Sequence, residues 1–219
     1  CTGSNYISSA TLARMNEAAK QGKDSLGLVG IPCQVIALRK MQASKHETGA
    51  KGVKLVIGLF CTWALSYTAF AEFLKGKVDL AKVKRIDIPP PPANVMVVET
   101  SAGDVRFSLD EVRKFIKPTC GVCYDMTSEF ADISVGMVEG IEDWNTLIVR
   151  TPAGKKFIDK AKKAGVLNTR PLELARLDHL KEASSIKKKR AIDAIQKRTN
   201  DKKNLLYLRL SAQEKKKLI

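Results

Sequence analysis

The order of strand and helix patterns near the start of the chain constrains the fold most. An apolar run at residues 26–29, typical of a buried strand, leads directly into apolar positions at helical spacing between residues 35 and 41. A β-branched run at residues 53–60 follows, and then a helical pattern that closes at Gly76. Because this order is typical of parallel strands joined by helices, we predict an α/β fold with a mostly parallel sheet flanked by helices.

The pattern changes after Gly76 to short strands joined by turn residues. Four consecutive prolines at residues 89–92 exclude a helix there, and residues 101–104 (SAGD) are typical of a hairpin turn. We therefore predict a small antiparallel insert, with strands at residues 83–88, 94–100 and 104–109.

The chain then returns to the earlier alternation. A short helix pattern follows Ser108, which fits the capping position. Two strand patterns, at residues 131–138 and 146–151, precede a helix that begins with Thr151 and Pro152. After Pro171 the sequence becomes helical and basic.

Positive charge is concentrated at the end of the chain. The net charge is +15, and residues 178–219 hold 13 Lys and Arg against 5 Asp and Glu. We predict two parts: residues 1–177 as the functional domain, incomplete at its N-terminus because the first residue is Cys1, and residues 178–219 as a basic helical tail. The tail is either solvated, or a docking surface for an acidic partner subunit, or a surface for nucleic acid or membrane.

Several function classes lack their sequence signals. Tyr207 is the only aromatic residue of the tail, so a stacking platform for single-stranded nucleic acid is absent from it. No run of about 18 apolar residues indicates a membrane span. No HExxH, GxGxxG or P-loop motif occurs, and the two histidines are too few for a histidine-based site. We predict no nucleic-acid partner and no membrane span.

Four of the five cysteines are placed where a shared ligand site is possible. Cys120 and Cys123 form a Cys-x-x-Cys pair, whose spacing lets two thiolates reach one metal centre. Cys33 and Cys61 each follow a predicted parallel strand, at the edge where open α/β sheets bind ligands. Four soft ligands suit a [4Fe–4S] cluster or a structural zinc ion, and the alternative is that Cys33 and Cys61 are buried small apolar residues. Cys1, at the chain end, is the weakest candidate.

Five sequence motifs, in order along the first 170 residues, resemble those of the coenzyme F420 hydrogenase/dehydrogenase beta-subunit family. They are GSNYISSATL, LVGIPCQVIALRKM, VIGLFC, CGVCYDMTSEFADISVG and WNTLIVRTPAGKKF. The resemblance implies a cytoplasmic oxidoreductase subunit that exchanges a hydride between coenzyme F420 and FAD. Single electrons would then pass through a [4Fe–4S] cluster to the partner subunits of a hydrogenase-, formate dehydrogenase- or heterodisulfide reductase-like complex.

Site residues follow from the same resemblance. The implied cluster ligands are Cys33, Cys61, Cys120 and Cys123. The implied flavin contacts are Gly3, Ser4, Asn5, Tyr6, Gly30, Ile31, Pro32, Gln34, Asp132, Gly136, Trp144, Asn145 and Thr146.

The chain departs from the family's usual motifs at two of these positions. Asn5 replaces a lysine and Ile31 replaces a threonine, which leaves the identity of the hydride carrier open. The alternative function is a non-catalytic docking subunit of a redox complex that carries a metal ion or a cluster.

Overall fold

A computed structural model of the 219-residue chain describes residues 6–46, 49–89, 92–138, 141, 143–201, 204–208, 210–211 and 213. Cys1 and three of the predicted flavin contacts, Gly3, Ser4 and Asn5, lie outside the described residues. The chain forms two compact units. Unit 1 comprises Cys1–Ser9 and Trp63–Gly121, and unit 2 comprises Ala10–Thr62 and Val122–Ile219.

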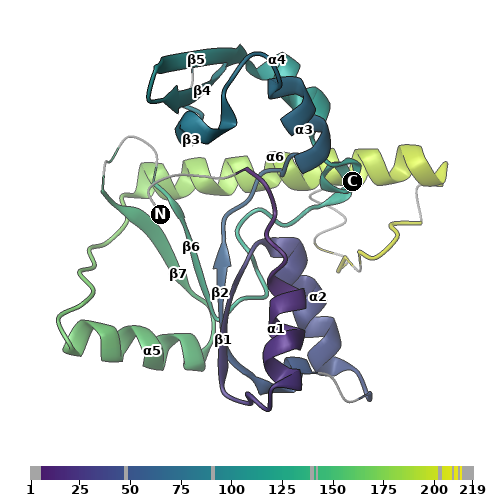
Figure 1. Cartoon of the computed structure of the whole chain (residues 1–219). Coiled ribbons are helices and arrows are strands. Elements are labelled where there is room, and N and C mark those ends of the chain that lie inside the picture. Colours follow the sequence, from purple (N-terminus) through teal and green to yellow (C-terminus); the bar gives the residue numbers. More distant parts are fainter. Residues whose placement is uncertain are drawn as a thin grey trace. The chain divides into compact units, whose positions relative to one another are not determined.

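Unit 2 is built on a four-stranded sheet in the order β1-β2-β6-β7 (Figure 1). Strand β2 runs parallel to both β1 and β6, whereas β7 is antiparallel to β6. This arrangement confirms the predicted mostly parallel sheet. The strands are β1 (Leu26–Gly30), β2 (Val53–Leu59), β6 (Ile133–Met137) and β7 (Asn145–Val149).

Helices flank this sheet, as the sequence predicts. Leu28 and Val56 point from one face of the sheet into a core that α1 and α2 complete, with Met15, Val35 and Leu38 buried there. In Figure 1, α1 and α2 lie together beside this part of the sheet. The helices of unit 2 are α1 (Thr11–Lys20), α2 (Pro32–Ala43), α5 (Pro152–Lys163) and α6 (Leu174–Thr199).

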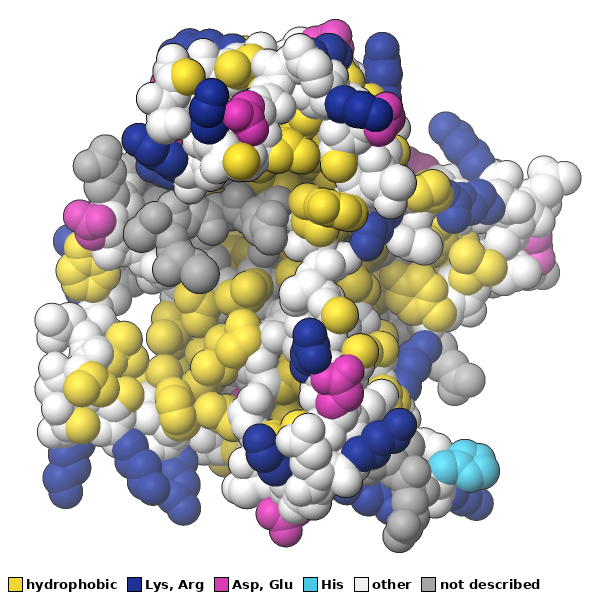
Figure 2. Space-filling view, viewed as in Figure 1, with side chains coloured by type: hydrophobic (Ala, Val, Ile, Leu, Met, Phe, Trp, Pro, Cys, Tyr) yellow, Lys and Arg dark blue, Asp and Glu magenta, His cyan; other side chains and the backbone are white. Residues whose placement is uncertain are grey.

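The opposite face of the sheet is apolar and only partly covered. The strand register places Val29, Ile57, Ile133 and Val149 in one row across it. Helix α5 covers Ile133, where Gly154 approaches the Ile133 side chain, but Val29 and Val149 remain 51% and 41% exposed. Figure 2 shows hydrophobic side chains gathered where these strands and α5 lie.

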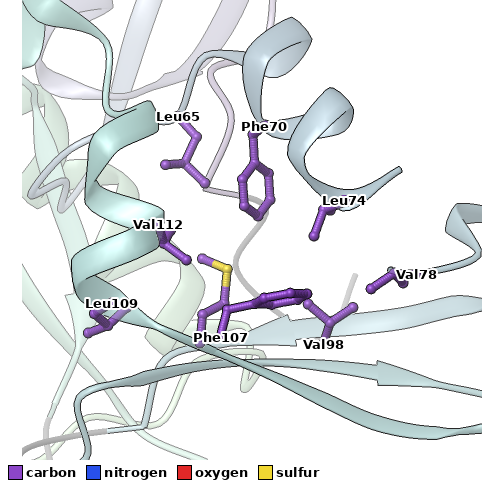
Figure 3. Close-up of a cluster of buried hydrophobic side chains, with 9 residues drawn as sticks. Leu65, Phe70, Leu74, Val78, Val98, Phe107, Leu109 and Val112 are labelled. Carbon is purple, nitrogen blue, oxygen red and sulfur yellow. The ribbon is translucent and has the colours of Figure 1, made fainter. Parts of the chain in front are cut away.

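Unit 1 is a three-stranded antiparallel sheet packed against helices. The hydrophobic core joins Phe70 and Leu74 of α3 to Val98 and Phe107 of the sheet, with Val112 of α4 beside them (Figure 3). The elements are α3 (Tyr67–Leu74), β3 (Val83–Asp87), β4 (Val95–Thr100), β5 (Gly103–Ser108) and the short α4 (Leu109–Val112).

The role of α3 differs from the sequence expectation. Its pattern predicts a helix beside the parallel sheet, but α3 packs into the core of unit 1. The connection from β2 to the next parallel strand, β6, therefore contains the whole of residues 63–121. The sequence of a helix that follows a strand does not indicate against which of two sheets its apolar side will pack.

The predicted division between residues 177 and 178 falls inside a helix. Helix α6 spans Leu174–Thr199, and its residues Ala191, Ile192 and Ile195 are buried. Residues 122–219 belong to the same compact unit as residues 10–62. In the part of the chain that the structure describes, no helix is both long enough and apolar enough to cross a membrane.

Close packing at one glycine of β2 gives a stability prediction. A Cβ atom on Gly58 would overlap the Ser128 side chain, whereas a Cβ on Gly27 of β1 would meet nothing within 4 Å. We expect Gly58→Ala to lower the free energy of unfolding by about 2 kcal/mol through overpacking. Gly27→Ala, the matched control, should change it by less than about 0.5 kcal/mol. Urea denaturation of both variants checks this, and equal midpoints would contradict the packing of residue 128 against β2.

Candidate functional site

Cys33 lies at the start of α2, directly after β1. Ile31 precedes the helix with an extended backbone, and Pro32 is the first helical residue. The Gln34 Oε1 atom accepts a hydrogen bond from the Ile31 N–H at 3.1 Å, which closes the turn. Proline suits this position because the first helical N–H has no partner within the helix. The turn therefore holds an exposed Cys33 at the carboxyl edge of the sheet.

Cys61 follows the neighbouring strand β2, and hydrogen bonds fix its backbone on both sides. Its N–H donates to the Met126 carbonyl at 2.9 Å, and its own carbonyl accepts from the Lys187 Nζ at 2.6 Å. Because β1 and β2 are parallel, Cys33 and Cys61 lie at the same edge of the sheet, as predicted.

The Cys-x-x-Cys pair crosses from one unit to the other. Cys120 belongs to unit 1, where its sulfur atom accepts a hydrogen bond from the Ala64 N–H at 3.3 Å. Cys123 belongs to unit 2, where its thiol lies 3.7 Å from the Asp125 carbonyl. Both thiols are half-buried and free.

Tyr207 joins Cys33 and Cys123 into one neighbourhood of unit 2. Its hydroxyl donates to the Val122 carbonyl at 2.7 Å. Burial raises the pKa of Tyr207 to about 12, with smaller contributions in the same direction from the nearby Cys123, Asp125 and Cys33. Cys33 and Cys123 therefore lie in the neighbourhood of the same phenol.

The structure brings three predicted ligands, Cys33, Cys61 and Cys123, to one region of unit 2. Among the described residues, no three Cys, His, Asp or Glu side chains form a group that could hold a metal ion. The predicted convergence of all four sulfur atoms therefore stays a prediction. The residues themselves fit a cluster by their chemistry, because thiolates are the usual iron–sulfur ligands and none of the four cysteines is fully buried.

Asp132, a predicted flavin contact, forms hydrogen bonds and an ion pair within the protein, and its contact with a flavin stays a prediction. Its side chain is buried, and Oδ2 accepts from the Val56 N–H at 2.8 Å and pairs with Arg39 at 3.2 Å. Its Oδ1 accepts from the Thr151 hydroxyl at 2.8 Å. Three elements are joined at this carboxylate: β2, α2 and the start of α5.

Other predicted flavin contacts also have packing roles. Gly136 leaves room for the Phe60 ring, which a Cβ atom there would overlap. The Trp144 ring lies against the Arg170 guanidinium at 4.3 Å. Tyr6, in unit 1, accepts a hydrogen bond at its hydroxyl from the Ile88 N–H at 3.1 Å. Flavin contact by these residues stays a prediction, as it does for Gly30, Ile31, Pro32, Gln34, Asn145 and Thr146.

Two cationic side chains that hydrogen-bond the loop after Cys123 were not predicted. Arg150 donates to the Ser134 hydroxyl at 2.7 Å and to the Thr127 hydroxyl at 2.8 Å. Lys187 is only 3% exposed and donates to the carbonyls of Cys61 and Asp125. The available signal for Lys187 was its spacing, because it lies four and eight residues before the buried Ala191 and Ile195.

Asp125 is a buried carboxyl group in the same loop. Its Oδ2 accepts from the Glu129 N–H at 2.9 Å, whereas Oδ1 is buried with no hydrogen-bond partner among the described residues. Burial raises the pKa of this carboxyl, and the nearby Lys187 acts in the opposite direction.

A known family matches most of this structure. The sequence profile for the C terminus of the beta subunit of coenzyme F420 hydrogenase/dehydrogenase matches residues 23–175. The chain belongs to this family. The match includes Cys33, Cys61, Cys120 and Cys123, and it ends just inside α6.

Several known proteins are similar to most of the chain. The coenzyme F420 hydrogenase subunit beta of Methanothermobacter thermautotrophicus is 31% identical over 86% of this chain and 69% of its own length. The subunit of the same name from Methanococcus voltae is 30% identical, and the match spans 61% of its length. The coenzyme F420-dependent sulfite reductase of Methanocaldococcus jannaschii is 31% identical over 78% of this chain but only 29% of its own length.

A solved structure has the same fold. It is a xenon derivative of the F420-reducing [NiFe] hydrogenase complex from Methanosarcina barkeri, and one of its chains superposes with a TM-score of 0.82 at 29% identity. The alignment covers 90% of this chain and 70% of that chain.

The packing role of Asp132 can be tested by removing its charge. We expect Asp132→Asn to lower the free energy of unfolding by about 2 kcal/mol, because it leaves Arg39 without its buried partner and replaces an acceptor by a donor. The control is Asp159→Asn on α5, whose pair with Lys155 is exposed and should contribute less than about 1 kcal/mol. Chemical denaturation measures both values. Equal stabilities with a loss of flavin in the Asp132 variant alone would instead favour a direct cofactor contact.

Proposed function

We propose that this chain is the flavin- and iron–sulfur-bearing subunit of an F420-linked redox complex. The observation that carries the proposal is the family match over residues 23–175, which includes the four cysteines Cys33, Cys61, Cys120 and Cys123. The similar proteins named as F420 hydrogenase and F420-dependent sulfite reductase support the F420 link. The partners would be other subunits of a hydrogenase-, formate dehydrogenase- or heterodisulfide reductase-like complex, and the location would be cytoplasmic.

The chain's residues would divide the work between two cofactors. When bound, FAD would exchange a hydride with coenzyme F420, and a [4Fe–4S] cluster would carry single electrons to the partner. Cys33, Cys61, Cys120 and Cys123 would hold the cluster. The turn after β1 would position Cys33 at the sheet edge, and the Met126 carbonyl and Lys187 would fix Cys61.

The N-terminus of α2 supplies part of the electrostatics. Backbone N–H groups at a helix start carry partial positive charge and favour an anionic neighbour. Cys33 is the second residue of this 12-residue helix. A thiolate at Cys33 would therefore be stabilised by α2, which suits a ligand that must be deprotonated to bind iron.

Cofactor content tests the proposal directly. We expect the full chain, purified or reconstituted without oxygen, to contain FAD and about four iron atoms per chain. Cys120→Ala should lose iron, whereas Thr119→Ala, an exposed neighbour that is no ligand type, should keep it. Iron analysis, acid-labile sulfide and the visible spectrum of the flavin measure this. Zinc in place of iron, or a chain without flavin, would favour the docking-subunit alternative.

Electron transfer separates the two cofactor roles. A Cys120→Ala protein that keeps FAD should still have its flavin bleached by reduced coenzyme F420, because hydride exchange needs only the flavin. The same variant should fail to reduce a one-electron acceptor at the wild-type rate, and stopped-flow absorbance follows both steps. Normal electron transfer by this variant would remove the cluster from the path.

A further inference from the structure

The basic C-terminal segment contains one lysine that differs from its neighbours. In the run Lys187-Lys188-Lys189, Lys187 is 3% exposed, whereas Lys189 is exposed to solvent. Lys187 donates hydrogen bonds at 2.6 Å to the Cys61 carbonyl and at 2.8 Å to the Asp125 carbonyl. One ammonium group thus joins the backbone after β2 to the backbone of the Cys123 loop.

A buried ammonium group is costly unless its surroundings compensate for lost hydration. Two carbonyl groups compensate only in part, because they are neutral dipoles. Among the described residues, no carboxylate forms an ion pair with Lys187, although the Asp125 carboxyl is near enough to feel its charge. Within the described residues the ammonium is therefore a cation at the cysteine region that forms no ion pair with a carboxylate, and thiolates or an anionic group bound to them would add opposite charge to that of the nearby Asp125 carboxyl.

The rest of the C-terminal segment holds the same loop at further points. Ile192 and Ile195 of α6 and Leu205 share a buried cluster with Val122 and Tyr124, which flank Cys123. Tyr207 donates to the Val122 carbonyl, and Lys188 pairs with Glu129 at 2.6 Å. The C-terminal segment thus contacts the loop at Val122, Asp125 and Glu129, and the contact of Lys187 with Asp125 is the middle one of the three.

We propose that Lys187 is a positioning residue of the redox site: it fixes the backbone of Cys61 against the Cys123 loop and supplies the positive charge that favours an anionic, thiolate-bound cofactor there. The cofactor half of this inference rests on the proposed function. The positioning half rests only on the hydrogen bonds to Cys61 and Asp125.

Hydrogen exchange tests the positioning half without any cofactor. In the cofactor-free full chain, we expect Lys187→Met to raise the amide exchange rates of Cys61 and Glu129 by at least about tenfold. The Cys61 N–H donates to the Met126 carbonyl, and the Glu129 N–H donates to the Asp125 carboxylate. Lys189→Met, on the exposed side of the same run, should leave both rates unchanged. Equal exchange in the two variants would overturn the proposal. If Lys187→Met does not fold, Lys187→Gln, which keeps one donor without the charge, replaces it in the same comparison.

Iron uptake and reduction potential test the cofactor half. A nearby cation stabilises the more negative, reduced state of a cluster, so we expect the reduction potential of Lys187→Met to be more negative than that of wild type and of Lys189→Met. Its iron content should fall below that of both, and Lys187→Arg, which keeps the charge, should restore the potential toward wild type. If Lys187→Met shows faster amide exchange but an unchanged iron content and reduction potential, Lys187 is only a structural residue and its role in the redox site is overturned. Wild-type protein that takes up no iron would instead overturn the proposed function, with the exchange result still deciding the positioning role.

Discussion

The buried carboxylate of Asp132 holds unit 2 together. It accepts from the β2 backbone at Val56, pairs with Arg39 of α2 and accepts from Thr151 at the start of α5. A charge this deeply buried is tolerated because each oxygen atom has a protein partner. The carboxylate fixes both helices relative to the sheet, and with them the edge at which Cys33 and Cys61 lie.

The cysteine region is built from segments that are far apart in the sequence. Strand ends supply Cys33 and Cys61, the loop before β6 supplies Cys123, and the C-terminal segment supplies Lys187 and Tyr207. Parallel strands account for the first two, because their carboxyl ends meet at one edge. The C-terminal contribution has a different origin, since it depends on a buried stripe of α6 that packs beside the loop.

Local sequence signals, such as helix caps, account for the elements that were predicted correctly. Ser108 and Thr151 cap their helices as expected, with the Ser108 hydroxyl accepting from Asp110 and the Thr151 hydroxyl from Gly154. For the first helix the sequence favours Ser8 or Ser9 as the cap, whereas the observed N-cap is Ala10. Helix ends are set by one or two hydrogen bonds and are therefore easily shifted by a residue or two.

The sequence by itself determined the strand and helix types, the mostly parallel sheet and the edge where two of the cysteines lie, because periodicity and capping are local properties. Only the tertiary structure decided that α3 packs in unit 1 rather than on the parallel sheet. It also decided that Asp132 pairs with Arg39 and accepts a hydrogen bond from Thr151, and that Lys187 is the buried residue of the run Lys187-Lys188-Lys189. These outcomes depend on which residues, distant in the sequence, a side chain contacts after folding. The local sequence around that side chain does not indicate those contacts.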